Sequence, residues 1–84
     1  MNDDEARTII IQAMREVAPE VDLGSVPPQA DLRDELDIDS MDFLNFIVGL
    51  HEKTGIDVPE EDYEHFATLQ GAIDYVVRRA DAAA

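Results

Sequence analysis

The segment at residues 36–55 reads LDIDSMDFLNFIVGLHEKTG, and it decides the fold more than any other part of the chain. It opens with a helix-start signal, because Asp39 can cap a helix and Asp42 follows it as in a carboxylate variant of the capping box. It closes at Gly55, a residue type that helix C-termini favour. The residues between these two signals, 40–53, are therefore predicted to form a helix.

This helix is apolar over an unusually wide arc, since seven of its residues carry large apolar side chains. Such a helix either lies at the centre of the fold or exposes an apolar face. We expect Leu44, Ile47 and Leu50 in the core. Met41 and Val48 lie one face away from that set. Core packing is the expected role for both, and the alternatives are exposure as an apolar partner contact or a place in the wall of a cavity for a bound apolar chain.

A further helix is predicted near the N-terminus, where apolar residues recur at helical spacing from Asp3 to Ala18. Asn2 or Asp3 can cap this helix, and Pro19 ends it. Residues 19–39 are irregular, with one glycine and further prolines. They nevertheless keep six aliphatic residues: Val21, Leu23, Val26, Leu32, Leu36 and Ile38. We therefore expect a long ordered loop that is pinned to the core.

The C-terminal part is predicted to form one short and one longer helical segment. Pro59 opens a short acidic turn at residues 60–64, in a position where its missing N–H does least harm. Thr68 can cap a last helix, along which apolar residues recur at helical spacing. Arg78 and Arg79 are expected in the last turn of that helix, where they would oppose its negative dipole end.

Taken together, these segments predict an all-α fold. We expect a small four-helix bundle of three main helices plus one short helix, with a long loop between helices 1 and 2. Residues 1–84 are too few for a second domain and are expected to form a single domain. Its last residues, 81–84, are expected to form a frayed tail.

The composition is strongly acidic, with 20 Asp and Glu against 6 Lys and Arg and a formal net charge of −14. Such a surface excludes nucleic acid and anionic membranes as partners and favours basic protein patches. The absence of Cys removes disulfides, thiolate nucleophiles and thiolate metal sites. Because the N-terminus is acidic and no apolar run approaches bilayer length, we expect a cytoplasmic protein without membrane insertion.

Catalytic and metal-binding patterns are scarce in this chain. His51 and His65 lack His-x-x-His spacing, so we expect solvated or half-buried histidines rather than metal ligands. A calcium-binding loop counted from Asp37 fails at three of the positions that define it. A chain of this size should also lack a deep catalytic cavity. The sequence therefore predicts no enzyme, no catalytic residue and no metal site.

The junction between the long loop and the apolar helix, Asp39-Ser40-Met41, has a more specific chemistry. A hydroxyl in the first turn of a helix is exposed, and an attached phosphate would lie against free backbone N–H groups and the positive dipole end. The alternative is that Asp-Ser only starts a helix, as it does in many unrelated proteins. The surrounding segments favour the first interpretation.

The sequence resembles the acyl carrier protein family over nearly its whole length. The amphipathic first helix and the long loop carry part of this resemblance. Three motifs carry the rest: Leu36-Asp37-Ile38-Asp39-Ser40-Met41-Asp42, Gly55-Ile56-Asp57-Val58-Pro59-Glu60 and Thr68-Leu69-Gln70. In this family a separate transferase attaches 4′-phosphopantetheine from coenzyme A to the serine of an Asp-Ser-Leu motif, and that serine matches Ser40. The family fold is a four-helix bundle with a short third helix.

The chain departs from the family pattern at four positions near this serine. Met41 stands where Leu is usual, which keeps the apolar contact. Asp37 stands where Gly is common. Asn45 and Gly49 stand where an acid and Ala are frequent. Because housekeeping fatty acid carriers use acids along this helix, their pattern of partner contacts need not transfer to this chain.

The resemblance implies a non-catalytic carrier, with Asp39 capping the helix and presenting Ser40. The thiol of the arm would carry acyl groups as thioesters between enzymes of fatty acid, polyketide or specialised lipid synthesis. The implied partners are a phosphopantetheinyl transferase and acyl-transferring and acyl-modifying enzymes with basic docking patches, and the carrier itself is expected to be a monomer. Partner contacts are expected from Asp37, Met41, Asp42, Asn45 and Val48.

Most of the net charge flanks Ser40, since residues 31–64 contain twelve acids and two bases, Arg33 and Lys53. Such a field raises encounter rates with basic patches and gives a salt-sensitive affinity, which suits a shuttle. We also expect an expandable cleft between the second and the last main helix, where an acyl chain could be held.

Two alternatives stay open at this point. The first is an aminoacyl or peptidyl carrier, although these are usually less acidic and show Gly before the modified element. The second is an unmodified acidic interaction domain, such as a nucleic acid mimic that sequesters a basic protein. That second role needs no serine at position 40, whereas the carrier role depends on it.

Overall fold

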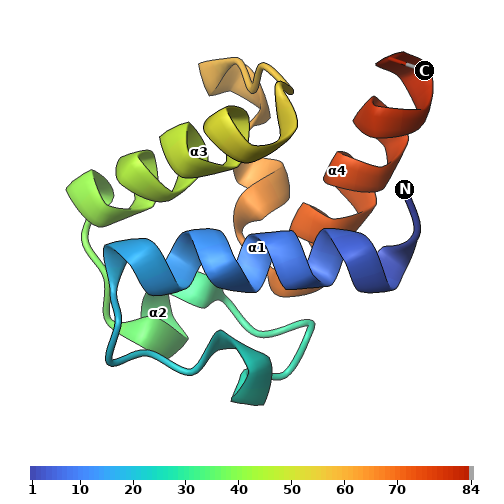
Figure 1. Ribbon diagram of the computed structural model, residues 1–84. Coiled ribbons are helices and arrows are strands. Elements are labelled where there is room, and N and C mark those ends of the chain that lie inside the picture. The colour runs from blue at the N-terminus through green and yellow to red at the C-terminus, as the bar shows by residue number, and fades with distance from the viewer. Residues whose placement is uncertain (84) are drawn as a thin grey trace.

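The computed structural model describes residues 1–83, and within this part of the chain it contains helices but no strand. The elements, in order, are α1 (Asp3–Val17), the 3₁₀ helix η1 (Leu23–Ser25), α2 (Leu32–Leu36), α3 (Ser40–Thr54), the 3₁₀ helix η2 (Glu60–Phe66) and α4 (Leu69–Ala83) (Figure 1). The predicted all-α helical bundle is confirmed. Its short third helix is η2.

The helix α1 is central, because it packs against both α3 and α4. In Figure 1, α3 and η2 lie above α1, while the loop at residues 18–39 and α2 lie below it. The 3₁₀ helix η2 packs against α4. Both termini lie at one end of this arrangement, where the N-terminal ammonium is 3.6 Å from the Asp81 carboxylate.

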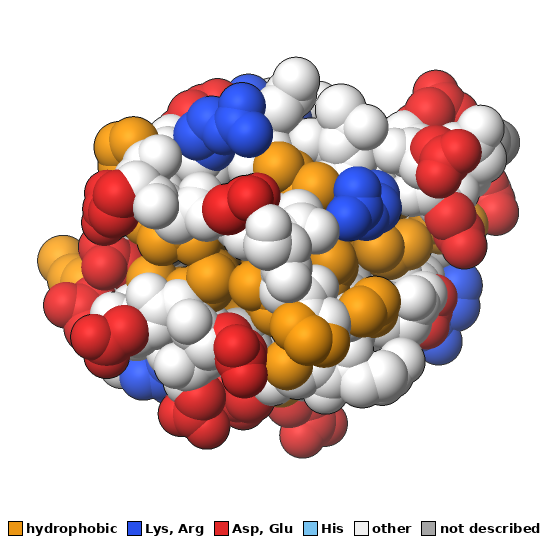
Figure 2. Space-filling model, turned by 90° about the horizontal axis from the view of Figure 1, so that it is seen from below, with side chains coloured by type: hydrophobic (Ala, Val, Ile, Leu, Met, Phe, Trp, Pro, Cys, Tyr) orange, Lys and Arg blue, Asp and Glu red, His pale blue; other side chains and the backbone are white. Residues whose placement is uncertain are grey.

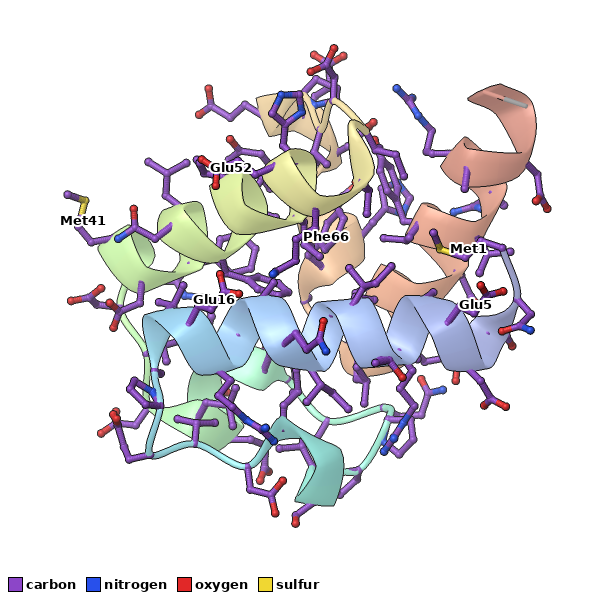
Figure 3. All side chains as sticks on the ribbon, in the orientation of Figure 1. Met1, Glu5, Glu16, Met41, Glu52 and Phe66 are labelled. Carbon is purple, nitrogen blue, oxygen red and sulfur yellow. The ribbon has the colours of Figure 1, made fainter. Side chains whose placement is uncertain are left out.

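The core takes large side chains from every long helix and from η2. Among those that are almost fully buried are Ile10 of α1, Phe46 of α3, Phe66 of η2 and Leu69 of α4. The rings of Phe46 and Phe66 meet edge to face, with centroids 6.3 Å apart, a geometry that aromatic pairs favour. Figure 3 shows Phe66 in the interior, between α1 and α3 in this view.

Three helix ends form at the predicted residues. Asn2 and Glu5 form a full capping box at the start of α1. The Thr68 hydroxyl accepts a hydrogen bond from the backbone N–H of Gly71, at 3.0 Å, at the start of α4. Gly55 ends α3 with φ = 73°, a left-handed conformation that costs glycine little.

The long loop is pinned to the core as predicted, through the buried side chains of Leu23, Val26 and Ile38. It also contains an element that the sequence did not predict, the five-residue helix α2. This helix is held in place by the fully buried Leu32, whose backbone N–H donates to the Ala67 carbonyl at 2.7 Å. Five residues are too few to show helical periodicity, so the sequence pattern could not predict α2.

The exposed side of α3 corrects two predictions. Leu44, expected in the core, is 42% exposed, and Met41 and Val48, for which core packing was favoured, are 66% and 47% exposed. These three residues follow one another at spacings of three and four, so they share one side of the helix. The neighbouring elements cover the opposite side, which carries Phe43, Phe46, Ile47 and Leu50.

The last helix is longer than predicted. Because α4 continues to Ala83, Arg78 and Arg79 do not lie in its last turn, and the expected role at the helix dipole is wrong. Arg79 instead donates to the Asp57 carbonyl, at 3.2 Å, and lies over the ring of Tyr75. The structure shows helix at residues 81–83, where a frayed tail was predicted; residue 84 lies outside the described residues.

Candidate functional site

Ser40 is the first residue of α3 and is exposed. Asp39 precedes it as the N-cap, and its side chain accepts a hydrogen bond from the backbone N–H of Asp42 at 2.9 Å. The predicted N-cap at Asp39 is confirmed. The reciprocal bond of the predicted capping box, from the Asp39 N–H to the Asp42 side chain, is not among the hydrogen bonds of this turn. The Asp39 cap fixes the first turn of a fifteen-residue helix, so the Ser40 hydroxyl is held at the positive end of the helix dipole.

A basic side chain that sequence reasoning did not single out contacts this hydroxyl. Arg33 of α2 donates a hydrogen bond from Nη2 to Ser40 Oγ at 3.0 Å. The same guanidinium lies over the ring of Phe43, 5.9 Å from its centroid, within the range of a cation–π contact. The contact depends on α2, and its only signal in the sequence is the scarcity of bases near Ser40.

The turn between α2 and α3 is made by Asp37, which has φ = 52° and ψ = 43°. This is the left-handed region, and Asp37 is the one non-glycine residue with positive φ in the described chain. Asp tolerates this region better than most residues, although Gly tolerates it best. Asp37 therefore ends α2 and reverses the chain, so that Asp39 can begin α3.

A cavity of about 600 Å³ opens beside Ser40. Its wall is mixed, with apolar side chains next to acids and one arginine. The lining residues come from α2, from the start of α3 and from η2 and the residues that flank them: Asp31, Arg33, Ser40, Phe43, Leu44, Glu60, Tyr63, Glu64 and Ala67. This cavity is not the expandable cleft predicted between α3 and α4, because α4 lines no part of it. That cleft stays a prediction.

The residues predicted to contact partners lie around the same end of α3. Met41, Asn45 and Val48 are exposed on one side of the helix, Asp37 is exposed just before it, and Asp42 is half-buried. The structure adds Leu44, which sequence reasoning had placed in the core. Figure 3 shows Met41 projecting away from the molecule at the beginning of α3. We call Met41, Leu44, Asn45 and Val48 the outer face of α3.

Acidic side chains dominate the surroundings of this site. Figure 2 shows the side of the molecule that carries the loop and α2, where Asp and Glu side chains border a band of hydrophobic side chains and basic groups are few. Lys53, the other base in residues 31–64, is paired with Glu16 of α1 at 2.6 Å. Among the ion pairs of the described residues, none involves Arg33.

Two histidines and one tyrosine away from Ser40 make side-chain contacts within the bundle. His51 lies 3.1 Å from the Ile56 carbonyl and 3.2 Å from the Asp57 carboxylate, and the ring of His65 is tilted against that of Tyr75, with centroids 5.4 Å apart. The buried Tyr75 hydroxyl donates to Asp62 at 2.8 Å. Burial, together with this hydrogen bond, raises the pKa of Tyr75 above its ordinary value. Tyr75 therefore ties η2 to α4 in its neutral form.

The described residues contain neither a metal-binding cluster nor a membrane-spanning helix. Within residues 1–83, no group of three or more His, Cys, Asp or Glu side chains is arranged to hold a metal ion. No helix in that range is both long and apolar enough to cross a membrane.

Comparisons with known proteins point to one family. Residues 8–76 match the family described as "Phosphopantetheine attachment site". The chain is 35% identical over 79 residues to an acyl carrier protein of Rubrobacter xylanophilus, a match that covers 90% of this chain and 98% of that protein. It is 30% identical over 70 residues to an acyl carrier protein of Myxococcus xanthus, covering 80% of this chain and 89% of that protein.

A solved structure shares the fold. It is an acyl carrier protein from Enterococcus faecalis that matches 94% of this chain and 99% of its own chain, with a TM-score of 0.71 at 23% sequence identity. At this level of identity the likeness is one of fold, and it extends over the long loop as well as the helices.

Proposed function

The chain belongs to the acyl carrier protein family, and on that premise we propose that Ser40 is the residue to which its 4′-phosphopantetheine arm is attached. As an acyl carrier, the protein holds acyl groups as thioesters on the thiol of this arm. The observation that carries the assignment to Ser40 is the state of its hydroxyl. Among the described contacts, Oγ accepts a hydrogen bond from Arg33, and no carboxylate or carbonyl of the described residues accepts its proton.

The other serine of the chain provides the comparison. Ser25 lies in the three-residue helix η1, and its hydroxyl donates to Asp22 at 2.6 Å. Its proton is therefore engaged by a carboxylate of its own turn. Ser40, in contrast, stands at the first turn of a long helix beside a cavity of about 600 Å³. Both features fit a phosphate ester that bears a long flexible arm.

The attachment is a phosphoryl transfer from coenzyme A. Ser40 Oγ forms a bond to the phosphorus of the pantetheine half, while the pyrophosphate P–O bond breaks and adenosine 3′,5′-bisphosphate leaves. The hydroxyl proton passes to a base of the transferase. The carrier contributes the nucleophilic oxygen and its position, and Asp39 fixes that position by capping α3. We therefore expect the carrier itself to be non-catalytic.

Partner enzymes are proposed to dock on the outer face of α3 and on the acids next to it, Asp37 and Asp42. Three exposed apolar side chains and a surrounding acidic field would match a patch on the enzyme that is basic at its rim and apolar at its centre. The phosphopantetheinyl transferase and the acyl-transferring and acyl-modifying enzymes would share this surface. We propose that the carrier works as a monomer in the cytoplasm.

The test is to co-express the chain with a broad-specificity phosphopantetheinyl transferase and to weigh the intact protein. We expect a mass increase of one phosphopantetheine in the wild type and in Ser25→Ala, and no increase in Ser40→Ala. Ser25→Ala is a matched control because it removes the only other serine hydroxyl. An unmodified wild type with several transferases, or an arm on Ser40→Ala, would contradict the proposal.

A further inference from the structure

Arg33 occupies an unusual position in the charge distribution of this protein. Residues 31–64 contain twelve acids, and Arg33 and Lys53 are their only bases. Lys53 is held against Glu16 of α1. The guanidinium of Arg33 therefore stands as the one positive group of the cavity wall, and it lies in hydrogen-bond contact with Ser40 Oγ.

This placement is supported by the packing of α2. The Asp31 side chain caps that helix by accepting from the Asp34 N–H at 3.1 Å, and the fully buried Leu32 anchors it. Arg33, the next residue, is consequently held at the cavity wall. The ring of Phe43 supports the guanidinium from α3, with 5.9 Å between the guanidinium carbon and the ring centroid. A long side chain that is stacked in this way loses less freedom when it binds an anion.

The phosphodiester of the arm would add a negative charge to a cavity whose wall already carries three acids. A phosphodiester on Ser40 carries one negative charge and would stand among Asp31, Glu60 and Glu64 of the cavity wall. Like charges at short range repel, and this repulsion opposes the modified state. A guanidinium presents five donors in a planar fork that matches phosphate oxygens, and the contact with Ser40 Oγ uses only one of them.

Building on the proposed attachment at Ser40, we propose that Arg33 is the phosphate-binding residue of the modified protein. The two non-bridging oxygens of the diester are bonded to the phosphorus that Oγ would carry, so they lie within reach of the fork that already contacts Oγ. By binding them, Arg33 offsets the acidic surroundings and directs the start of the arm along Phe43 towards the cavity. Arg33 is thus a positioning residue and takes no part in forming the ester.

The test compares modified and unmodified forms of the wild type, Arg33→Ala and Arg33→Gln. Arg78→Ala is the matched control, because it removes the same charge from α4, which lines no part of the cavity. Two quantities are measured for each protein: the ³¹P resonance of the diester and the difference in melting temperature between its modified and unmodified forms. Mass spectrometry first establishes that each sample carries one arm.

We expect the ³¹P resonance to move by more than its linewidth in both Arg33 variants and to stay in place in Arg78→Ala. The modified form of each Arg33 variant should melt about 2–5 °C lower relative to its unmodified form than the wild type does, as expected for losing one partly exposed ion pair in a domain of this size. Arg33→Gln keeps most of the stacking surface, so a shift in both variants assigns the effect to the charge.

Unchanged ³¹P resonances and unchanged melting differences in the Arg33 variants would overturn this inference while leaving attachment at Ser40 intact. A change of equal size in Arg78→Ala would also overturn it, since the effect would then reflect net charge alone. A wild-type chain that gains no arm would instead overturn the proposed function, and this inference with it.

Discussion

The two faces of α3 are similar in composition and opposite in role. The inner face, which carries Phe43, Phe46, Ile47 and Leu50, is buried against the rest of the bundle. The outer face carries Met41, Leu44 and Val48, which are between 42% and 66% exposed. A residue's hydrophobicity therefore does not say which of the two tasks it serves. The inner face stabilises the fold, and the outer face is the surface that we propose for docking.

The largest expected difference between the two faces of α3 is their effect on the free energy of unfolding. Phe46→Ala removes a fully buried ring that contacts Phe66, and we expect it to lower the free energy of unfolding by about 3–5 kcal/mol, a large part of the total for so small a domain. Val48→Ala, on the outer face of the same helix, should change it by less than about 0.5 kcal/mol. Urea unfolding measures both. Equal losses in the two variants would abolish the distinction between the faces.

The outer face should matter for partners instead. Leu44→Ala is expected to raise the KM of a phosphopantetheinyl transferase for this carrier about five- to tenfold, because about 1 kcal/mol of apolar burial at the interface is lost. Its melting temperature should stay close to that of the wild type. Leu44→Met keeps the apolar volume and should restore the KM. A large fall in stability with an unchanged KM would place Leu44 with the inner face.

A smaller effect on stability, confined to alkaline pH, is expected at Tyr75, which joins η2 to α4. Because the pKa of Tyr75 is raised in the folded state, the unfolded chain loses this proton first as the pH rises. The contribution of Tyr75 to stability should therefore be constant below about pH 10, the ordinary tyrosine pKa, and should be lost as the pH rises through the higher folded value.

Tyr75→Phe tests this directly. It should cost about 1 kcal/mol at neutral pH through the lost hydrogen bond to Asp62, and it should remove this tyrosine's share of the alkaline decline. Urea unfolding at pH 8 and above pH 10 measures both effects. Tyr63→Phe is the control, because Tyr63 is only half-buried. An alkaline decline of unchanged size in Tyr75→Phe would show that another group is responsible.

The contrast between the two faces also explains what the sequence could predict. Caps and helix ends depend on neighbouring residues, so Asp39, Gly55 and Thr68 were identified correctly, and Ser40 was placed at a helix start. The role of Leu44 depends on which side of α3 the other elements cover, and one helical pattern contains no such information. Arg33 was missed for a related reason, because its contact with Ser40 exists only through α2, which is too short to show a period.

The ion pair between the N-terminal ammonium and Asp81 has a practical consequence. It brings the two ends of the described chain together at one pole of the molecule, and Figure 3 shows Met1 and Met41 at opposite sides of the view. A tag, a fluorophore or a surface linkage at Met1 would therefore lie away from the start of α3. If Ser40 is the attachment site as proposed, we expect a carrier that is immobilised through Met1 to be modified at Ser40 by an enzyme in solution.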